Sequence, residues 1–160
     1  MHQFIEQSIN DLSGSDLALA EAAREASKRA FAPFSNFNVG AALLTKSGKI
    51  VCGTNYESAT YTLTTHAEQC AITTARASGE SGIQAIATFG KPAVAKTNSI
   101  VTPCGLCRQL IFEAGQLSGV DIEVIMLSSN FDRFIKSTIA KLLPIGFGAS
   151  DFGVDLSRHR

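Results

Sequence analysis

The apolar residues between positions 15 and 31 recur at the spacing of an α-helix. They lie three or four residues apart and form one narrow face, consisting of Leu19, Ala22, Ala23, Ala26 and Ala30. Alanine is the strongest helix former, and Ser15 is a suitable N-cap residue. The pattern therefore predicts a helix over 17–31, capped by Ser15, that ends before Pro33, because proline disfavours helical backbone in the residue preceding it.

Denser apolar runs follow and predict strands. Residues 38–45 and 50–55 are two such runs around the turn K-S-G-K, in which Gly48 permits the tight backbone, so we expect an antiparallel hairpin. The remaining pattern predicts a loop at 56–65, a helix at 66–78, a strand at 83–89, a loop at 90–100, a strand end, turn and helix within 99–115, a strand at 120–127 and a helix over 131–143 stopped by Pro144.

The order of these elements predicts an α/β layered domain. The 160 residues fit a single domain, 1–160, with its core at about 15–153. A hydrophobic content of 45% and a charged content of 18% are typical of a globular protein.

The charge and the chain start limit the partners and the location that we expect. The formal net charge is zero, which argues against a nucleic-acid partner or an anionic membrane. The first ten residues include Glu6 and no apolar run, so they do not resemble a secretory signal. The longest apolar run, 39–44, is far shorter than the roughly 18 residues of a membrane span. We expect a cytoplasmic protein whose cysteines are thiols or metal ligands.

Two short motifs indicate a metal site. T-T-H-A-E-Q-C-A-I (64–72) contains His66 and Glu68, and T-P-C-G-L-C-R-Q (102–109) contains Pro103, Cys104 and Cys107. A C-x-x-C pair alone is ambiguous between zinc and redox chemistry. Together, however, the two motifs match H-x-E…P-C-x-x-C, the pattern of zinc-dependent nucleobase deaminases. We predict one Zn²⁺ per chain held by His66, Cys104 and Cys107, with the fourth position left for water.

Glu68 is the predicted proton carrier of this site. Deamination requires one proton on the ring nitrogen and another on the departing ammonia, and a single carboxylate can shuttle both. His66 and Glu68 are two residues apart and do not share a helix face. They can converge if the metal lies beyond the first turns of two helices, whose positive ends also favour thiolates.

A second arrangement uses almost the same residues. His66 and Cys70 are four residues apart and share a helix face, so these two with Cys104 and Cys107 could form a closed structural zinc site. That arrangement leaves Glu68 and Pro103 without a role.

With these residues in view, the chain resembles the compact, single-domain cytidine deaminases from about Ala22 to Asp151. The matching pieces are F-A-P-F-S-N-F-N-V-G-A-A-L-L, G-T-N-Y-E-S-A, T-H-A-E-Q-C-A-I, T-P-C-G-L-C-R-Q and L-L-P-I-G-F-G-A-S-D-F. The resemblance implies a three-layer α/β/α fold with a mixed sheet of about five strands. It also implies hydrolysis of cytidine and deoxycytidine to uridine and deoxyuridine, with release of ammonia.

The resemblance assigns further site residues. Phe37 would stack on the pyrimidine, Asn55 and Glu57 would bind the ribose hydroxyls, and Ala67 would also contact the substrate. Around the metal it places Gln69, Pro103 and Arg108, with Arg108 as a donor to a thiolate. Without the resemblance, Phe37 would be ordinary core, Asn55 a turn residue and Glu57 a surface carboxylate.

The chain departs from the compact members at two positions. They commonly carry cysteine in place of His66 and arginine in place of Gln69. Three thiolates leave a negative zinc site that an arginine offsets, whereas two thiolates and a neutral histidine balance the ion, so glutamine suffices. In this respect the chain resembles the larger, two-domain cytidine deaminases.

The apolar tail near the end of the chain bears on the oligomeric state. Phe147 and Phe152 lie among glycines near the end of the chain, and the resemblance implies a homotetramer of 222 symmetry with shared active sites.

The motifs are compatible with more than one substrate. A related pyrimidine nucleoside or a nucleoside antibiotic of the blasticidin type is a second possible substrate. A nucleic-acid-editing deaminase and a non-catalytic zinc module are two further functions that the zinc motif by itself would allow.

Overall fold

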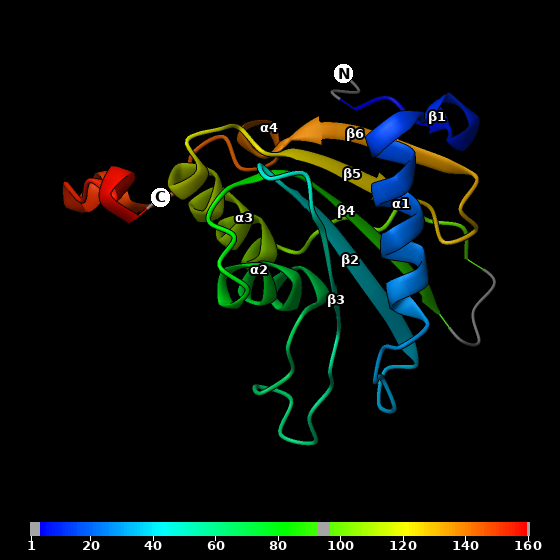
Figure 1. Cartoon of the computed structure of the whole chain (residues 1–160). Helices are drawn as coiled ribbons and strands as arrows, with labels where there is room; N and C mark the ends of the chain where they lie inside the picture. The colour runs from blue at the N-terminus through cyan, green and yellow to red at the C-terminus, as the bar shows by residue number, and fades with distance from the viewer. Residues whose placement is uncertain (1–3, 93–96, 160) are drawn as a thin grey trace.

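The computed structural model describes residues 4–92 and 97–159 (Figure 1). In chain order the elements are β1 (Gln7–Ser8), α1 (Gly14–Ser27), β2 (Phe37–Thr45), β3 (Ile50–Thr54), α2 (Ala67–Ala77), β4 (Ile83–Pro92), α3 (Gly105–Ser118), β5 (Glu123–Leu127), β6 (Arg133–Thr138) and α4 (Ile139–Leu142), with short 3-10 helices at Ile9–Asp11, Ala149–Phe152 and Leu156–His159. None of the helices in these two ranges is long and apolar enough to cross a membrane.

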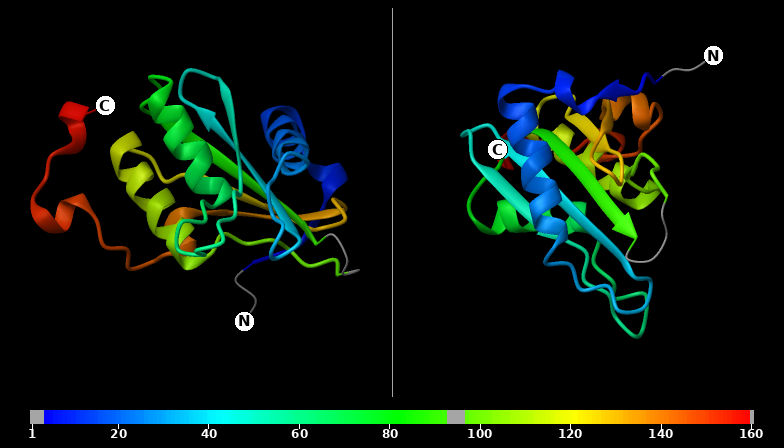
Figure 2. Two further views of the ribbon diagram at one scale, coloured as in Figure 1. Left: turned by 90° about the horizontal axis from the view of Figure 1, so that it is seen from below. Right: turned by 90° about the vertical axis from the view of Figure 1, so that its right-hand side faces the viewer.

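The strands form one mixed sheet between two layers of helices. The strand order is β1-β6-β5-β4-β2-β3, in which β4 and β5 are parallel and the other described neighbours antiparallel. Helix α1 covers one face of the sheet, while α2 and α3 lie side by side on the other (Figures 1 and 2). The predicted three-layer α/β/α fold is confirmed, with six strands in place of about five.

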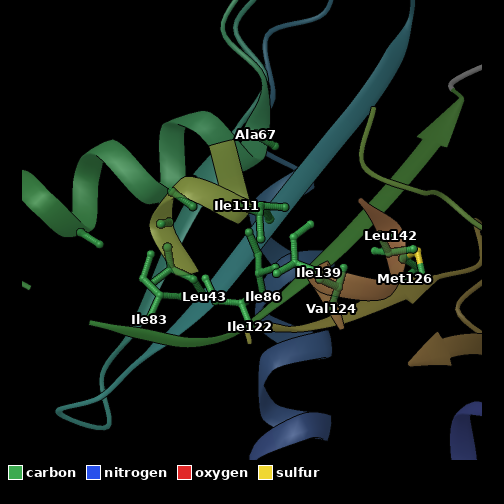
Figure 3. Packing of buried hydrophobic residues seen from close by; sticks show 14 residues of the cluster. Leu43, Ala67, Ile83, Ile86, Ile111, Ile122, Val124, Met126, Ile139 and Leu142 are labelled. Atoms are coloured by element: carbon green, nitrogen blue, oxygen red, sulfur yellow. The ribbon is translucent and has the colours of Figure 1, made fainter. Parts of the chain in front are cut away.

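Each face of the sheet has its own apolar core. Alternate residues of a strand point to opposite faces, so Leu43 and Ile86 pack toward α2 and α3, while Ala42 and Ala87 pack toward α1. Figure 3 shows the first cluster, in which Ala67 at the start of α2 packs with the side chains of the sheet. The beginning of α2 is therefore anchored directly to the core.

The predicted helix over 131–143 is wrong in its first half. Residues 133–138 form strand β6, which pairs with β5, and only Ile139–Leu142 are helical. A turn redirects the chain here: the Ser128 hydroxyl donates to Asp132 at 2.7 Å and accepts from the amides of Asp132 and Arg133. This turn chemistry overrides the helical apolar spacing that was used for the prediction.

Other predicted boundaries differ by a few residues. Helix α1 starts at Gly14 after Ser13 as N-cap, so the predicted cap at Ser15 is wrong. It ends at Ser27, and Phe31 instead forms a bridge to Tyr56. Strand β4 extends to Pro92 within the predicted 90–100 loop, of which residues 93–96 lie outside the described part. The hairpin at 38–55 is confirmed, with Gly48 at φ +86°.

Gly53 sets how closely α2 approaches the sheet. A Cβ at this position would lie 2.3 Å from both the Ala67 carbonyl oxygen and the Ala71 amide nitrogen. We expect Gly53→Ala to lower the free energy of unfolding by about 1–3 kcal/mol, because helix backbone must move to admit the methyl group. Gly105→Ala is the control, since a Cβ there meets nothing within 4 Å. Urea denaturation of both variants tests this, and equal stability would contradict it.

Candidate metal centre and active site

The two predicted motifs meet where two neighbouring helices begin. His66 is the N-cap residue of α2, and Cys104 is the N-cap residue of α3, each with extended backbone. Cys107 follows in the first turn of α3 and is buried. The amide groups of both helix starts point toward this region, which favours negative ligands there. The expectation that the site lies beyond two helix ends is confirmed.

The three predicted ligands lie at distances that suit one metal ion. His66 Nδ1 is 3.3 Å from Cys107 Sγ and 3.4 Å from Cys104 Sγ. Tetrahedral zinc with ordinary Zn–N and Zn–S bonds separates such atoms by about 3.6 Å. All three ligand atoms lie within 4.8 Å of one another. His66, Cys104 and Cys107 are thus placed to bind one metal ion.

Cys70 does not join this group in the described part of the chain. Its amide donates to the His66 carbonyl oxygen at 2.9 Å, as expected for the first full turn of α2. Because His66 is an N-cap residue and lies outside the regular helix, the four-residue spacing does not bring Cys70 to the metal. The closed site with four protein ligands is not what the structure forms.

The charges around Cys107 fit a cation. Burial raises the pKa of its thiol, and the nearby Glu68 carboxylate and Cys104 raise it further. A thiolate is therefore unfavourable here unless a positive ion compensates it. Cys104 and His66 are more accessible, so the group is open to the solvent on one side. Two sulfurs and one imidazole with an open side are the donor set of a catalytic zinc.

Glu68 lies inside this group of residues. Its side chain is 5% exposed, and it forms a hydrogen bond with Cys107. Burial raises the pKa of the Glu68 carboxyl above its ordinary value, although the hydrogen bonds and His66 oppose this effect. A carboxyl whose pKa is raised toward neutrality is able to take up and return a proton.

Backbone bridges bring the predicted ribose-binding segment next to the metal ligands. Tyr56 and Thr65 exchange two backbone hydrogen bonds of 3.0 Å, and Phe31 bridges to Tyr56 from the other side. Asn55 and Glu57 flank Tyr56, and His66 follows Thr65 in the chain. The segments 31–39, 55–57 and 64–66 are therefore neighbours at one end of the sheet.

Asn55 and Glu57 are both buried and bind the segment that carries Phe37. The Asn55 side chain donates to the Phe37 carbonyl oxygen at 3.0 Å and accepts from the Val39 amide at 2.9 Å. Glu57 accepts from the Phe34 and Ser35 amides at 2.8 and 3.2 Å and from the Ser35 hydroxyl. These bonds lower the pKa of Glu57, with the Ser35 hydroxyl contributing most. Sequence reasoning missed Ser35 as a partner.

The half-buried ring of Phe37 lies against strand β4 at Gly90. A Cβ on Gly90 would be 2.8 Å from Phe37 Cε1 and 3.1 Å from Val101 Cγ1. Glycine at this position therefore leaves room for the ring. Val101, which also lies beside Gly90, precedes Cys104 in the chain by three residues. Sequence reasoning missed Gly90 as well, because nothing local distinguishes it from other strand glycines.

The remaining predicted residues surround the ligands. Ala67 and Pro103 are buried, and half-buried Gln69 lines a cavity of about 170 Å³ together with Cys107. Arg108 Nε donates to the Pro103 carbonyl oxygen at 2.9 Å. The expected hydrogen bond from Arg108 to a thiolate does not occur among the described residues. Its guanidinium instead supports the turn that presents Cys104.

Comparison with known proteins places this site in a family. Residues 13–120 match the model of the cytidine and deoxycytidylate deaminase zinc-binding region. A cytidine deaminase of Halalkalibacterium halodurans is 40% identical over 134 residues, which cover 83% of this chain and 94% of that protein. A cytidine deaminase of Vibrio cholerae is 35% identical over 127 residues, which cover 78% of this chain and 37% of that longer protein.

Solved structures show the same relationship. The crystal structure of cytidine deaminase from Burkholderia pseudomallei is 38% identical, with a TM-score of 0.73, and the match covers 84% of this chain and all of that one. The enzyme from Mycobacterium tuberculosis is 29% identical, with a TM-score of 0.68 and coverage of 85% and 99%. Together with the site geometry, these matches show that the chain belongs to the zinc-binding cytidine and deoxycytidylate deaminase family.

Proposed function

We propose that this protein hydrolyses cytidine and deoxycytidine to uridine and deoxyuridine, with release of ammonia. The observation that carries this proposal is the buried Glu68 carboxyl beside His66, Cys104 and Cys107. An inert zinc module has no use for such a carboxyl, whose burial costs free energy. The reaction serves pyrimidine salvage. A cytoplasmic location agrees with the four cysteines, none of which forms a disulfide.

Different residues of the chain have different roles in this hydrolysis. His66, Cys104 and Cys107 would hold the zinc ion, which would supply Lewis-acid activation of a water molecule. Glu68 would take one proton from the water and pass it to the pyrimidine ring nitrogen, and would then carry the remaining hydroxyl proton to the amino group, which leaves as ammonia. Oxygen replaces the exocyclic amino group on the ring carbon, so water is consumed and ammonia is released.

Substrate selection follows from the neighbouring segments. Phe37 would stack on the pyrimidine, with Ala67 beside it, while Asn55 and Glu57 would bind the ribose hydroxyls. The carboxylate oxygens of Glu57 have lone pairs beyond those used by the 34–35 segment. The neutral net charge supports a free nucleoside in preference to a nucleic acid.

Ammonia release from a panel of compounds tests the proposal. The panel contains cytidine, deoxycytidine, free cytosine, blasticidin S and a cytosine-containing oligonucleotide. We expect turnover of the two nucleosides to exceed that of every other compound. Preference for the antibiotic or the oligonucleotide would contradict the proposed substrate class.

Asn55→Ala tests the role of the sugar. We expect kcat/KM for cytidine to fall about tenfold to a hundredfold, because buried polar groups lose their partner. Any activity on free cytosine should fall much less if Asn55 acts on the ribose. Equal losses on nucleoside and base would instead show that Asn55 acts only by positioning Phe37 through its bonds to the β2 backbone.

The C-terminal tail supports an assembly of several chains. Phe147 and Phe152 pack edge to face at 5.0 Å, yet they remain 59% and 71% exposed, and Ile145 is 95% exposed. The tail lies along α3, where Gln116 accepts from the Ala149 amide at 2.9 Å. Exposed aromatic groups of this kind are typical of surfaces that other subunits cover. We propose a homotetramer of 222 symmetry in which neighbours complete each active site.

Deletion of residues 146–160 tests this assembly. We expect sedimentation velocity to show a species smaller than the tetramer, and turnover of cytidine to fall with it. The paired substitution Phe147→Ser with Phe152→Ser should give the same result in a full-length chain. A wild-type monomer with full activity would contradict the shared active sites, and a stable dimer would indicate the architecture of the larger enzymes.

A further inference from the structure

A second cavity lies on the face of the sheet opposite the metal centre. It has a volume of about 520 Å³, within the range of small-molecule sites. Helix α1 crosses β2 and β4 on this face (Figure 2). The residues that line the cavity include the last turn of α1 and the end of β4. It is lined by Arg24, Ser27, Lys28, Asn38, Phe89, Lys91, Pro92, Ser129, Asn130 and Phe131.

The charged lining residues are all cations. Arg24, Lys28 and Lys91 line the cavity, and none of the described residues that line it is acidic. Lys28 pairs at 2.5 Å with Glu25, which is exposed and outside the lining. Arg24 has its guanidinium carbon 4.1 Å from the centre of the Phe131 ring. The protein as a whole is neutral, so this concentration of positive charge is local.

An aromatic wall adjoins these cations. Phe131 packs edge to face on buried Phe89, with ring centres 6.0 Å apart. Phe131 has φ +58°, an unfavourable backbone conformation for a bulky residue. The turn holds it there, with its amide donating to the Ser128 carbonyl oxygen at 2.8 Å. Strained residues of this kind cluster at ligand sites.

From this combination we infer a second binding site, for a nucleoside monophosphate. Three cations, of which Lys28 is paired with exposed Glu25, match a dianionic phosphate, and the partly exposed ring of Phe131, held by buried Phe89, matches a flat base. Asn38 and Asn130 supply amides that can donate and accept hydrogen bonds. The side chains around the metal centre have the opposite charge, because Glu57 and Glu68 lie in its neighbourhood. The two sites therefore select phosphorylated and unphosphorylated ligands, respectively.

The second site also adjoins the first through strand β2. Asn38 faces the cavity and follows Phe37, the proposed stacking residue, which faces the opposite side. Asn55 bonds to the backbone on both sides of Asn38, at Phe37 and Val39. A ligand held by Asn38 thus lies one residue from the proposed nucleoside pocket.

Calorimetric titration of the zinc-loaded protein with uridine 5′-monophosphate tests the inference. We expect binding that persists in saturating uridine, because uridine occupies only the deaminase site. The double variant Lys28→Gln, Lys91→Gln should bind about tenfold more weakly for each charge lost. Lys141→Gln, an exposed lysine on α4, is the matched control and should bind normally. Cytidine turnover should be the same in all three proteins.

Three results would overturn the inference. The first is no binding of uridine 5′-monophosphate by the wild-type protein. The second is binding that uridine abolishes and the double variant retains, which would place the ligand at the metal centre. The third is inorganic phosphate binding as tightly as the nucleotide, which would leave no role for the aromatic wall. Because the readout is binding, failure of the deaminase proposal would appear separately, as absent ammonia release.

Discussion

Glu68→Gln is expected to lose roughly a hundredfold to ten-thousandfold in kcat for cytidine, the range that a positioned acid–base group contributes. The amide has the shape of the carboxyl but cannot carry a proton between water, ring nitrogen and ammonia. Zinc should remain, because Glu68 is not among the three placed ligands. The fold should also remain, because the substitution keeps the volume of this buried side chain.

The matched control is Glu21→Gln, which changes an exposed carboxylate on α1 in the same way. It should leave kcat, zinc content and thermal stability unchanged. Elemental analysis and circular dichroism on each sample separate lost chemistry from lost structure. Glu68→Gln with full zinc, a native spectrum and near-normal turnover would remove Glu68 from the mechanism.

Substitution of a metal ligand is the second change with a large expected effect. His66→Ala, Cys104→Ala and Cys107→Ala should each lose most of the bound zinc and essentially all turnover. Two remaining ligands cannot define the three-ligand site of a catalytic zinc. Cys70→Ala is the control, because Cys70 lies outside the group of ligand atoms. It should keep one zinc per chain.

The effects on stability should differ between the two cysteine ligands. Cys107 is buried in the first turn of α3, whereas Cys104 is exposed. Cys107→Ala should therefore be destabilised more than Cys104→Ala, because both variants lose the ion and only Cys107→Ala also empties a buried position. If Cys70→Ala shed zinc while His66→Ala kept it, the assignment of the ligands would be wrong.

The hydrophobic pattern predicted the layers of this fold because, in most elements, the local apolar spacing agrees with the helix or strand that forms. The hairpin has the expected turn residue, and α2 and α3 follow the expected apolar spacing, so these elements appear near their predicted positions. Strand β6 was missed, since its formation depends on a hydrogen-bonded turn at 128–132 and on pairing with β5. Strand β1 has only two residues and depends wholly on β6.

The metal centre was predictable because its motif fixes residue types at short spacing. The proposed substrate pocket beside it was less predictable from the sequence. That Asn55 and Glu57 bind the 34–39 segment follows from long-range contacts between β2 and the loop after β3. The Arg108 contact depends on how α3 begins, which the motif does not specify. Glycines 53 and 90 matter through what packs on them, and this too is fixed only in the folded chain.

The most direct test of the central claim is zinc dependence of cytidine hydrolysis by the wild-type protein. Zinc and ammonia release are measured in one sample before chelation, after chelation and after stoichiometric Zn²⁺ is returned. We predict one zinc per chain at the start, loss of turnover in proportion to zinc removed, and recovery when it is restored. Unchanged ammonia release from protein stripped of zinc would contradict the account.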